Sequence, residues 1–223
     1  QTALSARLAK TIIGDPAMEG VRMGALATSL QVERVRESVE LLMKEQDIVY
    51  GDLDNFEVTG ADKNKGAFFS PILFRNDNPF EKIGVHSIEA FGPVSTLMPY
   101  KNLDEAVKLV ELGKGSLVTS IITNDDKLAR EFVTEAAHMN GRILVLNERC
   151  AKESTGHGSP MPLLTHGGPG RAGGGEEMGG IRGVLHYMQR TAIQGHPTTI
   201  SEITQQFQVG AVMPEANPHV FRK

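Results

Sequence analysis

Apolar residues recur at three- and four-residue spacing in several stretches of the chain, and this spacing predicts its helices. A helix at the amino end carries Leu4, Leu8 and Ile12 on one face and is ended by Gly14-Asp15-Pro16. A long helix follows Ser29 as its capping residue and has charges opposite an apolar face made of Val32, Val35, Val39, Leu42 and Met43. A short helix is predicted at 199–206.

Strand and helix patterns alternate regularly between residues 94 and 147. Strands are predicted at 94–100, 117–123 and 142–147. The intervening helices begin at Asn102, which has Glu105 at capping-box spacing, and at Asn124 or Asp125. This alternation predicts an α/β fold with parallel strands and right-handed crossovers, arranged as a three-layer α/β/α open sheet.

The other strand patterns are less regular. Residues 48–50 predict a short strand, and 68–74 predict another that Pro71 would confine to an edge or a bulge. Residues 184–193 alternate moderately and predict a strand that leaves its own domain. The tail at 210–223 has no periodicity and is expected to be a linker.

Composition narrows the function classes. The chain has 223 residues, is 40% hydrophobic and has a net charge of -4 with both signs interspersed, so a nucleic-acid surface is not expected. Its apolar runs are shorter than the roughly 18 residues that span a bilayer, so no membrane partner is expected. The single cysteine forms no internal disulfide framework and fits a reducing, cytoplasmic compartment.

The segment Glu89-Ala90-Phe91-Gly92-Pro93-Val94 combines a carboxylate, an aromatic ring and a turn. Gly92 permits a sharp bend and close backbone approach, while Pro93 fixes φ and removes a donor at a strand entrance. This geometry predicts that Glu89 and Phe91 lie at the mouth of a sheet, where open α/β folds bind ligands. The alternative is a surface loop with a solvated carboxylate and a packed ring.

Cys150 is a second candidate for chemistry. It follows a predicted strand and lies between Arg149 and Lys152, whose charges would favour a thiolate nucleophile. His157 and His166 are possible bases farther along the chain. The simpler interpretation is a free thiol in a polar loop, because nothing in the sequence fixes a distance between the cysteine and either histidine.

The glycine tract at 167–175 lacks the Gly-Lys-Ser/Thr ending of a phosphate-binding loop, and no buried strand leads into it. A tightly packed, mobile loop is therefore the preferred interpretation. His157 and His166 with Glu153 do not have the spacing of a zinc site, so no metal is expected.

Several segments, in one order, resemble the aldehyde dehydrogenase superfamily. They are Ile13-Gly14-Asp15-Pro16, Lys65 through Pro71, the 89–94 segment, the junction at 120–126, residues 141–147, and Gly167-Gly168 through Arg171. The run from His166 to Glu177 and the segment Tyr187-Met188-Gln189-Arg190-Thr191 resemble one branch of the family, the bifunctional phenylacetate degradation protein, in which the dehydrogenase precedes an enoyl-CoA-hydratase-like domain. The similar segments lie within residues 1–195.

The resemblance implies a domain organisation. Residues 1–183 would be part of an aldehyde dehydrogenase catalytic domain, 184–195 an oligomerisation strand, and 196–223 a helix and linker towards a hydratase-like domain. The absence of an initiator Met and of a turn before the first helix indicates a piece of a longer protein. The family's nucleophilic cysteine, its general base and most of its nucleotide-binding domain would then precede Gln1.

The resemblance also implies a mechanism and site residues. In the family a cysteine thiolate attacks the aldehyde, hydride passes to NAD or NADP, and an activated water releases the acid. Glu89 would hydrogen-bond the nicotinamide ribose and Phe91 would pack against the nicotinamide. Cys150 would lie in the loop at the aldehyde entrance, so no catalytic residue is expected in this chain. Pro169 and Ala172 depart from the family's usual glycine loop.

Two functions are therefore considered. The first is a fragment of an NAD(P)-dependent dehydrogenase that oxidises a small aldehyde, including a CoA-linked semialdehyde, in aromatic degradation. The second is a noncatalytic binding or assembly module that uses 184–193 to pair across subunits. Both predict a homo-oligomer, a dimer or a multiple of dimers.

Overall fold

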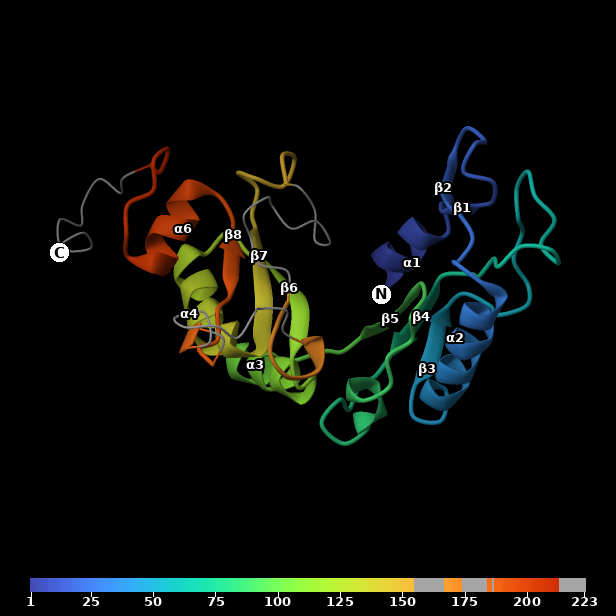
Figure 1. Ribbon diagram of the computed structural model, residues 1–223, viewed down its shortest axis with the longest axis horizontal. Coiled ribbons are helices and arrows are strands. Elements are labelled where there is room, and N and C mark those ends of the chain that lie inside the picture. Colours follow the sequence, from blue (N-terminus) through green and yellow to red (C-terminus); the bar gives the residue numbers. More distant parts are fainter. Residues whose placement is uncertain (155–166, 174–183, 186, 213–223) are drawn as a thin grey trace. The chain divides into compact units, whose positions relative to one another are not determined.

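The computed structural model describes residues 1–154, 167–173, 184–185 and 187–212, and the chain separates into two compact units, Gln1–Tyr100 and Lys101–Lys223 (Figure 1). The boundary falls inside the range expected to form one catalytic domain, 1–183. That expectation and those for 184–195 and 196–223 stay predictions. Each unit has its own hydrophobic core.

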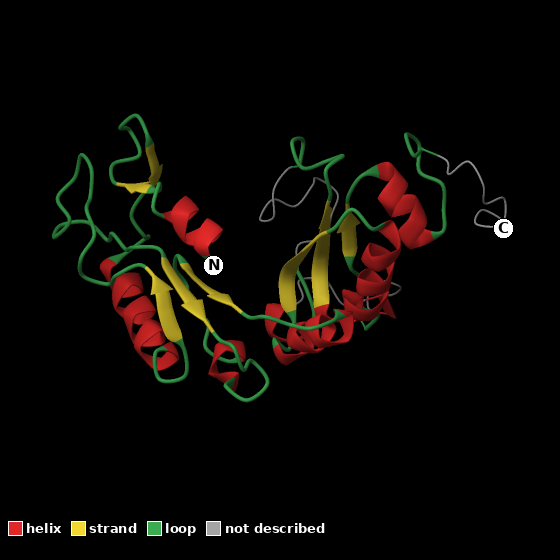
Figure 2. Cartoon of the chain, turned by 180° about the vertical axis from the view of Figure 1, so that it is seen from behind, coloured by secondary structure: helices red, strands yellow, loops and turns green. Residues whose placement is uncertain are grey.

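The first unit is built around a three-stranded sheet in the order β3-β4-β5. Its elements are α1 (Thr2–Leu8), β1 (Ile12–Ile13), β2 (Val21–Met23), α2 (Ser29–Leu42), β3 (Asp47–Tyr50), β4 (Ile72–Arg75), the 3-10 turn η1 (Ile83–His86) and β5 (Val94–Leu97). Strands β4 and β5 run parallel, and β3 is antiparallel to β4. A separate two-stranded sheet joins β1 and β2. Figure 2 shows α2 beside the three-stranded sheet.

Helix α2 covers the core of this unit. Val35, Val39 and Leu42 recur on one face at helical spacing and are buried against Phe69, Ile72 and Phe74. The predicted cap at Ser29 is wrong by one position, because the Thr28 side chain accepts the hydrogen bond from the Gln31 amide.

Two other expectations for the first unit are corrected. Ile12 belongs to β1, because α1 already ends at Leu8, and α1 buries none of its residues. The prediction that 68–74 is an edge strand is also wrong, although its alternative, a bulge, has a counterpart in the register shift between Ile48 and Tyr50 of β3, opposite Phe74 and Leu73. Strand β4 begins at Ile72, directly after the proline, and is the central strand of its sheet. Because Pro71 lies outside the ladder, its missing N–H costs the strand no hydrogen bond.

The second unit is built around the sheet β6-β7-β8, in which both strand pairs are parallel. Its elements are α3 (Leu103–Leu112), β6 (Ser116–Ile122), α4 (Asp126–Ala136), η2 (Ala137–Met139), β7 (Asn140–Leu146), η3 (Gly170–Ala172), β8 (Ala192–Gln194) and α6 (Pro197–Thr204). Val107 of α3, Phe132 of α4 and Ile143 of β7 meet in its core. The predicted alternation from 94 to 147 is thus present, although β5 pairs in the first unit and β6 in the second.

The helix starts of this unit follow their sequence signals. Asn102 accepts a hydrogen bond from the Glu105 amide, as the capping-box spacing predicts. Asp125, the second of the two predicted caps, accepts from the amides of Lys127 and Leu128. The last helix, α6, begins two residues earlier than expected. His196 is its capping residue, and Pro197 is its first helical residue.

The strand expected at 184–193 is shorter and lies later in the chain. Strand β8 pairs with β7 of the same chain at three positions. The side chains of Gln189 and Thr191 both donate to the carbonyl oxygen of Asn140, at 3.0 and 2.6 Å, and these bonds hold β8 beside the start of β7. Pairing of this segment across subunits stays a prediction.

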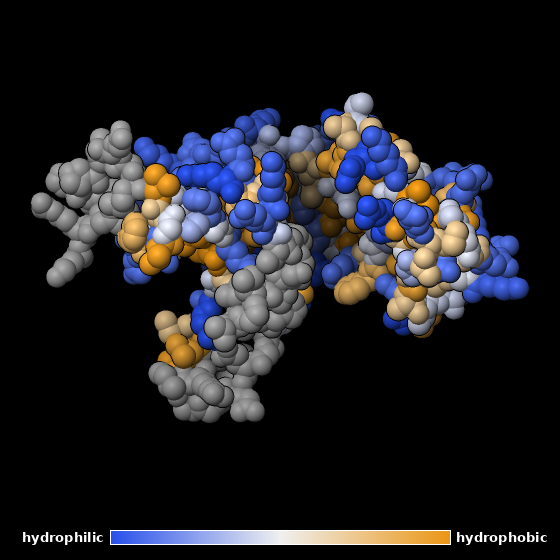
Figure 3. Space-filling model, turned by 90° about the horizontal axis from the view of Figure 1, so that it is seen from above, coloured by the Kyte–Doolittle hydropathy of each residue, from blue (hydrophilic) through white to orange (hydrophobic). Residues whose placement is uncertain are grey.

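The α/β class is confirmed: the three-stranded sheet of the second unit is parallel, and that of the first unit is mixed, with β4 and β5 parallel. On the face drawn in Figure 3, hydrophilic residues are spread among hydrophobic ones over each unit. Within the described ranges, none of the helices is long and apolar enough to cross a membrane.

Candidate functional site

Residues 89–94 form a tight, close-fitting connection into β5. The Gly92 amide donates to the carbonyl oxygen of Ala90, and the Val94 amide donates to that of Gly92, both at 2.8 Å. A Cβ atom at Gly92 would lie 2.9 Å from both γ carbons of Val35 on α2. Real Cβ atoms essentially never approach that closely, so the backbone reaches the helix only because position 92 is glycine. The close approach expected of Gly92 is confirmed.

The two candidate side chains project from this fixed backbone. Glu89 is exposed, and its side chain makes no hydrogen bond or ion pair within the described residues. The Phe91 side chain is 71% exposed. Ala90, between them, packs against the core of the unit. The alternative of a packed ring at position 91 is therefore wrong, and a carboxylate and an aromatic ring are presented together.

The position of the segment relative to its sheet corrects one expectation. Ile72 is paired with Val94, so β4 and β5 start at the same edge, and residues 89–91 lie just before their amino ends. The rule that ligands bind beyond the carboxyl ends of parallel strands therefore does not apply to this segment. The argument for a ligand must come from the side chains and from related proteins.

Helix α2 holds the loop that leads to this segment at two points. At the amino end of the helix, Gln31 Nε2 donates to the Phe91 carbonyl oxygen at 2.6 Å. Just past the other end, Glu45 Oε2 accepts from the Gly84 amide at 2.8 Å. Sequence reasoning missed both contacts. The spacing of Thr28 and Gln31 matches a capping box, which could have drawn attention to Gln31 but not to its distant partner.

Cys150 lies in a turn that follows β7, as the sequence predicts, and it is a free thiol. Its Sγ is half-buried and lies 3.7 Å from the carbonyl oxygen of Val145 and 3.8 Å from that of Asn147. These are weak contacts with neutral acceptors. The charge of Arg149, which was expected to favour a thiolate, is instead paired with Asp126: its Nη2 donates to both carboxylate oxygens, at 2.9 and 2.8 Å.

A cavity of about 410 Å³ adjoins Cys150 at the carboxyl ends of β7 and β8, and Glu153 and His196 also line it. The His196 Nδ1 accepts from the Thr198 amide as the cap of α6, so this ring nitrogen is occupied. His157 and His166, the two predicted bases, lie outside the described residues. Their part as bases for the thiol therefore stays a prediction.

A polar network beside this cavity was not foreseen from the sequence. The Thr199 hydroxyl, on α6, donates to Asp126 Oδ1 at 2.6 Å and accepts from Asn147 Nδ2 at 2.9 Å. Thr199 is 1% exposed and Asn147 3%. The network joins the start of α4, the end of β7 and α6, so it fixes the turn that carries Cys150.

The described part of the glycine tract, 167–173, packs backbone against backbone. A Cβ atom at Gly141 would overlap the carbonyl oxygen of Gly167, and one at Gly115 would overlap that of Pro169. The Arg171 amide donates to the Lys114 carbonyl oxygen at 3.0 Å. The tight packing expected of this tract is confirmed here, at the strand starts of β6 and β7.

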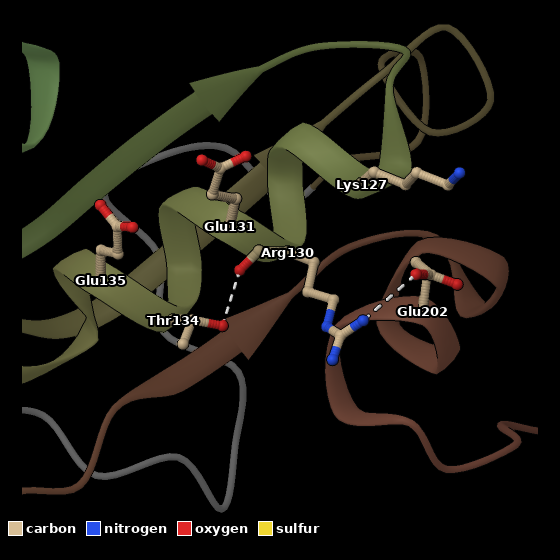
Figure 4. Close-up of a pocket in the computed structure, with 6 residues that line it drawn as sticks. All are labelled: Lys127, Arg130, Glu131, Thr134, Glu135 and Glu202. Carbon is tan, nitrogen blue, oxygen red and sulfur yellow. Dashed lines mark hydrogen bonds and ion pairs between the residues drawn. The ribbon is translucent and has the colours of Figure 1, made fainter. Parts of the chain in front are cut away.

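A charged groove between α4 and α6 has a volume of about 360 Å³. Figure 4 shows Arg130 reaching from α4 towards Glu202 on α6, with 3.8 Å between the charged atoms. Across the described ranges, no group of three or more His, Cys, Asp or Glu residues is arranged to hold a metal ion. Among the described residues, the 89–91 segment is the candidate that combines an exposed carboxylate without a hydrogen bond or ion pair and a 71% exposed ring on a fixed backbone.

Comparisons with known proteins agree on one family. The description "Aldehyde dehydrogenase family" matches residues 1–193. "Protein MaoC" of Klebsiella aerogenes is 50% identical over 202 residues, which cover 90% of this chain and 58% of that protein. The 3,4-dehydroadipyl-CoA semialdehyde dehydrogenase of Aromatoleum evansii is 37% identical over 167 residues, which cover 75% of this chain and 32% of that protein. The chain thus spans less than two thirds of either relative.

Solved structures show the same fold. A 3,6-anhydro-L-galactose dehydrogenase in complex with NAP has a TM-score of 0.64 at 23% identity, covering 82% of this chain and 35% of that one. A betaine aldehyde dehydrogenase of Staphylococcus aureus in complex with NAD+ has a TM-score of 0.62 at 18% identity, covering 77% of this chain and 32% of that one.

Proposed function

Because the chain belongs to the aldehyde dehydrogenase family, we propose that the whole protein is an NAD(P)-dependent aldehyde dehydrogenase and that Glu89 and Phe91 hold its nicotinamide nucleotide. The bound nucleotide would accept hydride from the substrate. The observation that carries the assignment to these residues is their exposure on a backbone fixed against α2: within the described residues the exposed Glu89 carboxylate makes no hydrogen bond or ion pair, and the Phe91 ring, two positions later, is 71% exposed.

The two side chains would do different work. A carboxylate accepts hydrogen bonds from two neighbouring hydroxyls, so Glu89 is suited to a ribose, and its charge strengthens both bonds. The Phe91 ring supplies a flat apolar surface for the nicotinamide and so restricts the orientations that the reacting carbon can take. Neither role distinguishes NAD from NADP, and we propose both as possible cofactors.

We further propose that the substrate is a CoA-linked semialdehyde formed during the degradation of aromatic compounds such as phenylacetate. The Aromatoleum evansii relative, named as a CoA semialdehyde dehydrogenase, supports this substrate class at 37% identity. A cytoplasmic, homo-oligomeric enzyme that uses a cysteine thiohemiacetal would fit the family. The alternative of a noncatalytic assembly module has less support, since β8 pairs within its own chain.

Cys150 is not proposed as the nucleophile, and we expect the 223-residue chain alone to lack dehydrogenase activity. The support is the environment of its thiol: its hydrogen-bond acceptors among the described residues are two neutral carbonyl oxygens, and Arg149 is bound to Asp126. Aldehyde-dependent formation of reduced cofactor by the chain alone, abolished by Cys150→Ser, would overturn this assignment.

Glu89→Gln in the whole protein tests the cofactor role. The amide keeps one acceptor but loses the charge, so we expect KM for NAD or NADP to rise roughly 5- to 30-fold, while KM for the aldehyde stays within about twofold. Glu81→Gln is the matched control, because Glu81 is an exposed carboxylate in the same unit. Equal cofactor kinetics in the two variants would show that Glu89 is only a solvated loop residue.

A further inference from the structure

Gln31 uses both ends of its side-chain amide to join two separate pieces of backbone, at Ala27 and at Phe91. Its Nε2 donates to the Phe91 carbonyl oxygen at 2.6 Å, and its Oε1 accepts from the Ala27 amide at 2.9 Å. Its own backbone amide donates to the Thr28 cap at 3.1 Å. The residue therefore ties the start of α2 to a peptide group 60 positions later in the chain.

The contact acts on backbone and leaves the candidate side chains free. The Phe91 carbonyl belongs to the peptide that joins Phe91 to Gly92, and Gly92 lies against Val35 one turn along the same helix. The peptide is thus held by a hydrogen bond on one side and by packing on the other. Rotation of that peptide would swing the Phe91 ring and alter the path of the backbone back to Glu89.

We propose that Gln31 is a positioning residue, which sets the orientation of Phe91 and Glu89 towards the nicotinamide nucleotide without itself supplying the surface they present. This inference rests on the proposed function. Binding groups are most effective when neighbouring hydrogen bonds fix their geometry before the ligand arrives. The amide is chemically suited to this position, because it provides one donor and one acceptor at the same time.

Gln31→Glu is the sharpest perturbation. The carboxylate still accepts from Ala27 but places an acceptor against the Phe91 carbonyl oxygen, where a donor is needed. Protonation of the introduced carboxyl restores an O–H donor. Arg36→Ala is the matched control: it removes α2 bonds to the Leu53 carbonyl oxygen and to Asp54, at 2.7 and 3.0 Å, and leaves Phe91 untouched.

The first measurement uses the 223-residue chain with a single 4-fluorophenylalanine at position 91, observed by fluorine NMR. We expect Gln31→Glu to change the resonance at pH 7 and to return it towards that of the unsubstituted chain as the pH falls and the carboxyl is protonated. Arg36→Ala should leave the resonance unchanged at both pH values. A resonance that is the same in Gln31→Glu and the unsubstituted chain, or a change that does not reverse, would refute the positioning role.

The second measurement uses the whole protein and tests the positioning role of Gln31 separately from the proposed nucleotide-binding function of Glu89 and Phe91. We expect Gln31→Glu to raise KM for the nucleotide roughly 3- to 10-fold at pH 7, with the aldehyde KM within about twofold, and Arg36→Ala to change neither. Phe91→Leu tests the function itself. If Phe91→Leu leaves nucleotide kinetics unchanged, the proposed function fails; if it alters them while Gln31→Glu does not, only the positioning role fails. Gln31→Met, which lacks both polar atoms, serves if the charged variant does not fold.

Discussion

Gly141→Ala should destabilise the second unit strongly, because the added methyl group has no free space. Its Cβ would overlap the Gly167 carbonyl oxygen, lie 2.8 Å from that carbonyl carbon and lie 3.1 Å from the Gly168 Cα. Real Cβ atoms keep at least 3.0 Å from such neighbours. Relief requires β7 and the 167–173 loop to separate, since all three contacts are with backbone atoms and none is with a side chain that can change rotamer.

The expected cost follows from overpacking. Inserting a methyl group into a filled site costs about 1–3 kcal/mol, and a backbone-to-backbone overlap belongs at the upper end of that range. A loss of about 3 kcal/mol corresponds to a faster exchange of the most protected β7 amides by roughly 100-fold. Exchange followed residue by residue reports on the second unit alone, which avoids the assumption that both units unfold together.

Gly113→Ala is the control for this prediction. Gly113 has a helical φ of -68° at the end of α3, and a Cβ there would lie 3.1 Å from the Val110 carbonyl oxygen, with no overlap of the kind found at Gly141. We expect its amide exchange to change by less than about fivefold. If the β7 amides exchange at the same rate in Gly141→Ala and Gly113→Ala, the 167–173 loop does not pack on β7 as described.

Two further predictions concern stability. Thr199→Val should lower the free energy of unfolding by about 1–3 kcal/mol in a denaturant titration, because it leaves the buried Asn147 amide without its acceptor. The control, Thr134→Val, removes one exposed hydrogen bond to the Arg130 carbonyl oxygen and should lower it less. Equal losses of unfolding free energy in the two variants would contradict the network. Amide hydrogen bonds from Asn55 and then Asp54 lower the pKa of the exposed Asp52 carboxyl. A lowered folded-state pKa means that the stabilisation is complete above the ordinary pKa and is lost as the pH falls through the lowered one. The NMR position of the Asn55 amide should therefore change at a lower pH than an unperturbed aspartate would give. Asp52→Asn should remove that acid transition, and a transition that persists would assign it to another group.

The sequence predicted those features that depend on neighbours along the chain. Asn102 and Asp125 cap helices because their side chains reach amides two or three residues away, and such spacings are visible in the sequence. The bend and close approach at Gly92 were predictable for the same reason, as glycine followed by proline marks a turn into a strand. The carboxylate and ring of the candidate site were identified in this way.

Features that depend on distant partners were missed or misplaced. The contact between Gln31 and Phe91 joins positions 60 residues apart, and no local pattern reports on it. Ile12 fits a helical face by spacing, yet it pairs with Val21 in β1–β2. The strand pattern at 184–193 could not reveal that Thr191 and Gln189 would bind the Asn140 carbonyl oxygen and confine the strand to its last residues. Tertiary pairing overrides local periodicity at each of these places.

The two prolines that precede β4 and β5 act together as a register stop. Ile72 and Val94 are paired, so Pro71 and Pro93 stand at the same level, each directly before the first paired residue of its strand. The Ile72 amide donates to the Pro93 carbonyl oxygen at 2.9 Å, and Pro93 has no N–H to offer beyond that bond. A slip by one residue would turn the buried faces outward, and a slip by two that brought Pro93 to the place of Ser95 would delete a ladder donor. The two proline rings therefore fix the register of β5 on β4, and with it the position of Glu89 and Phe91 along the sheet edge. This position should be kept in variants whose substitutions loosen the surrounding core.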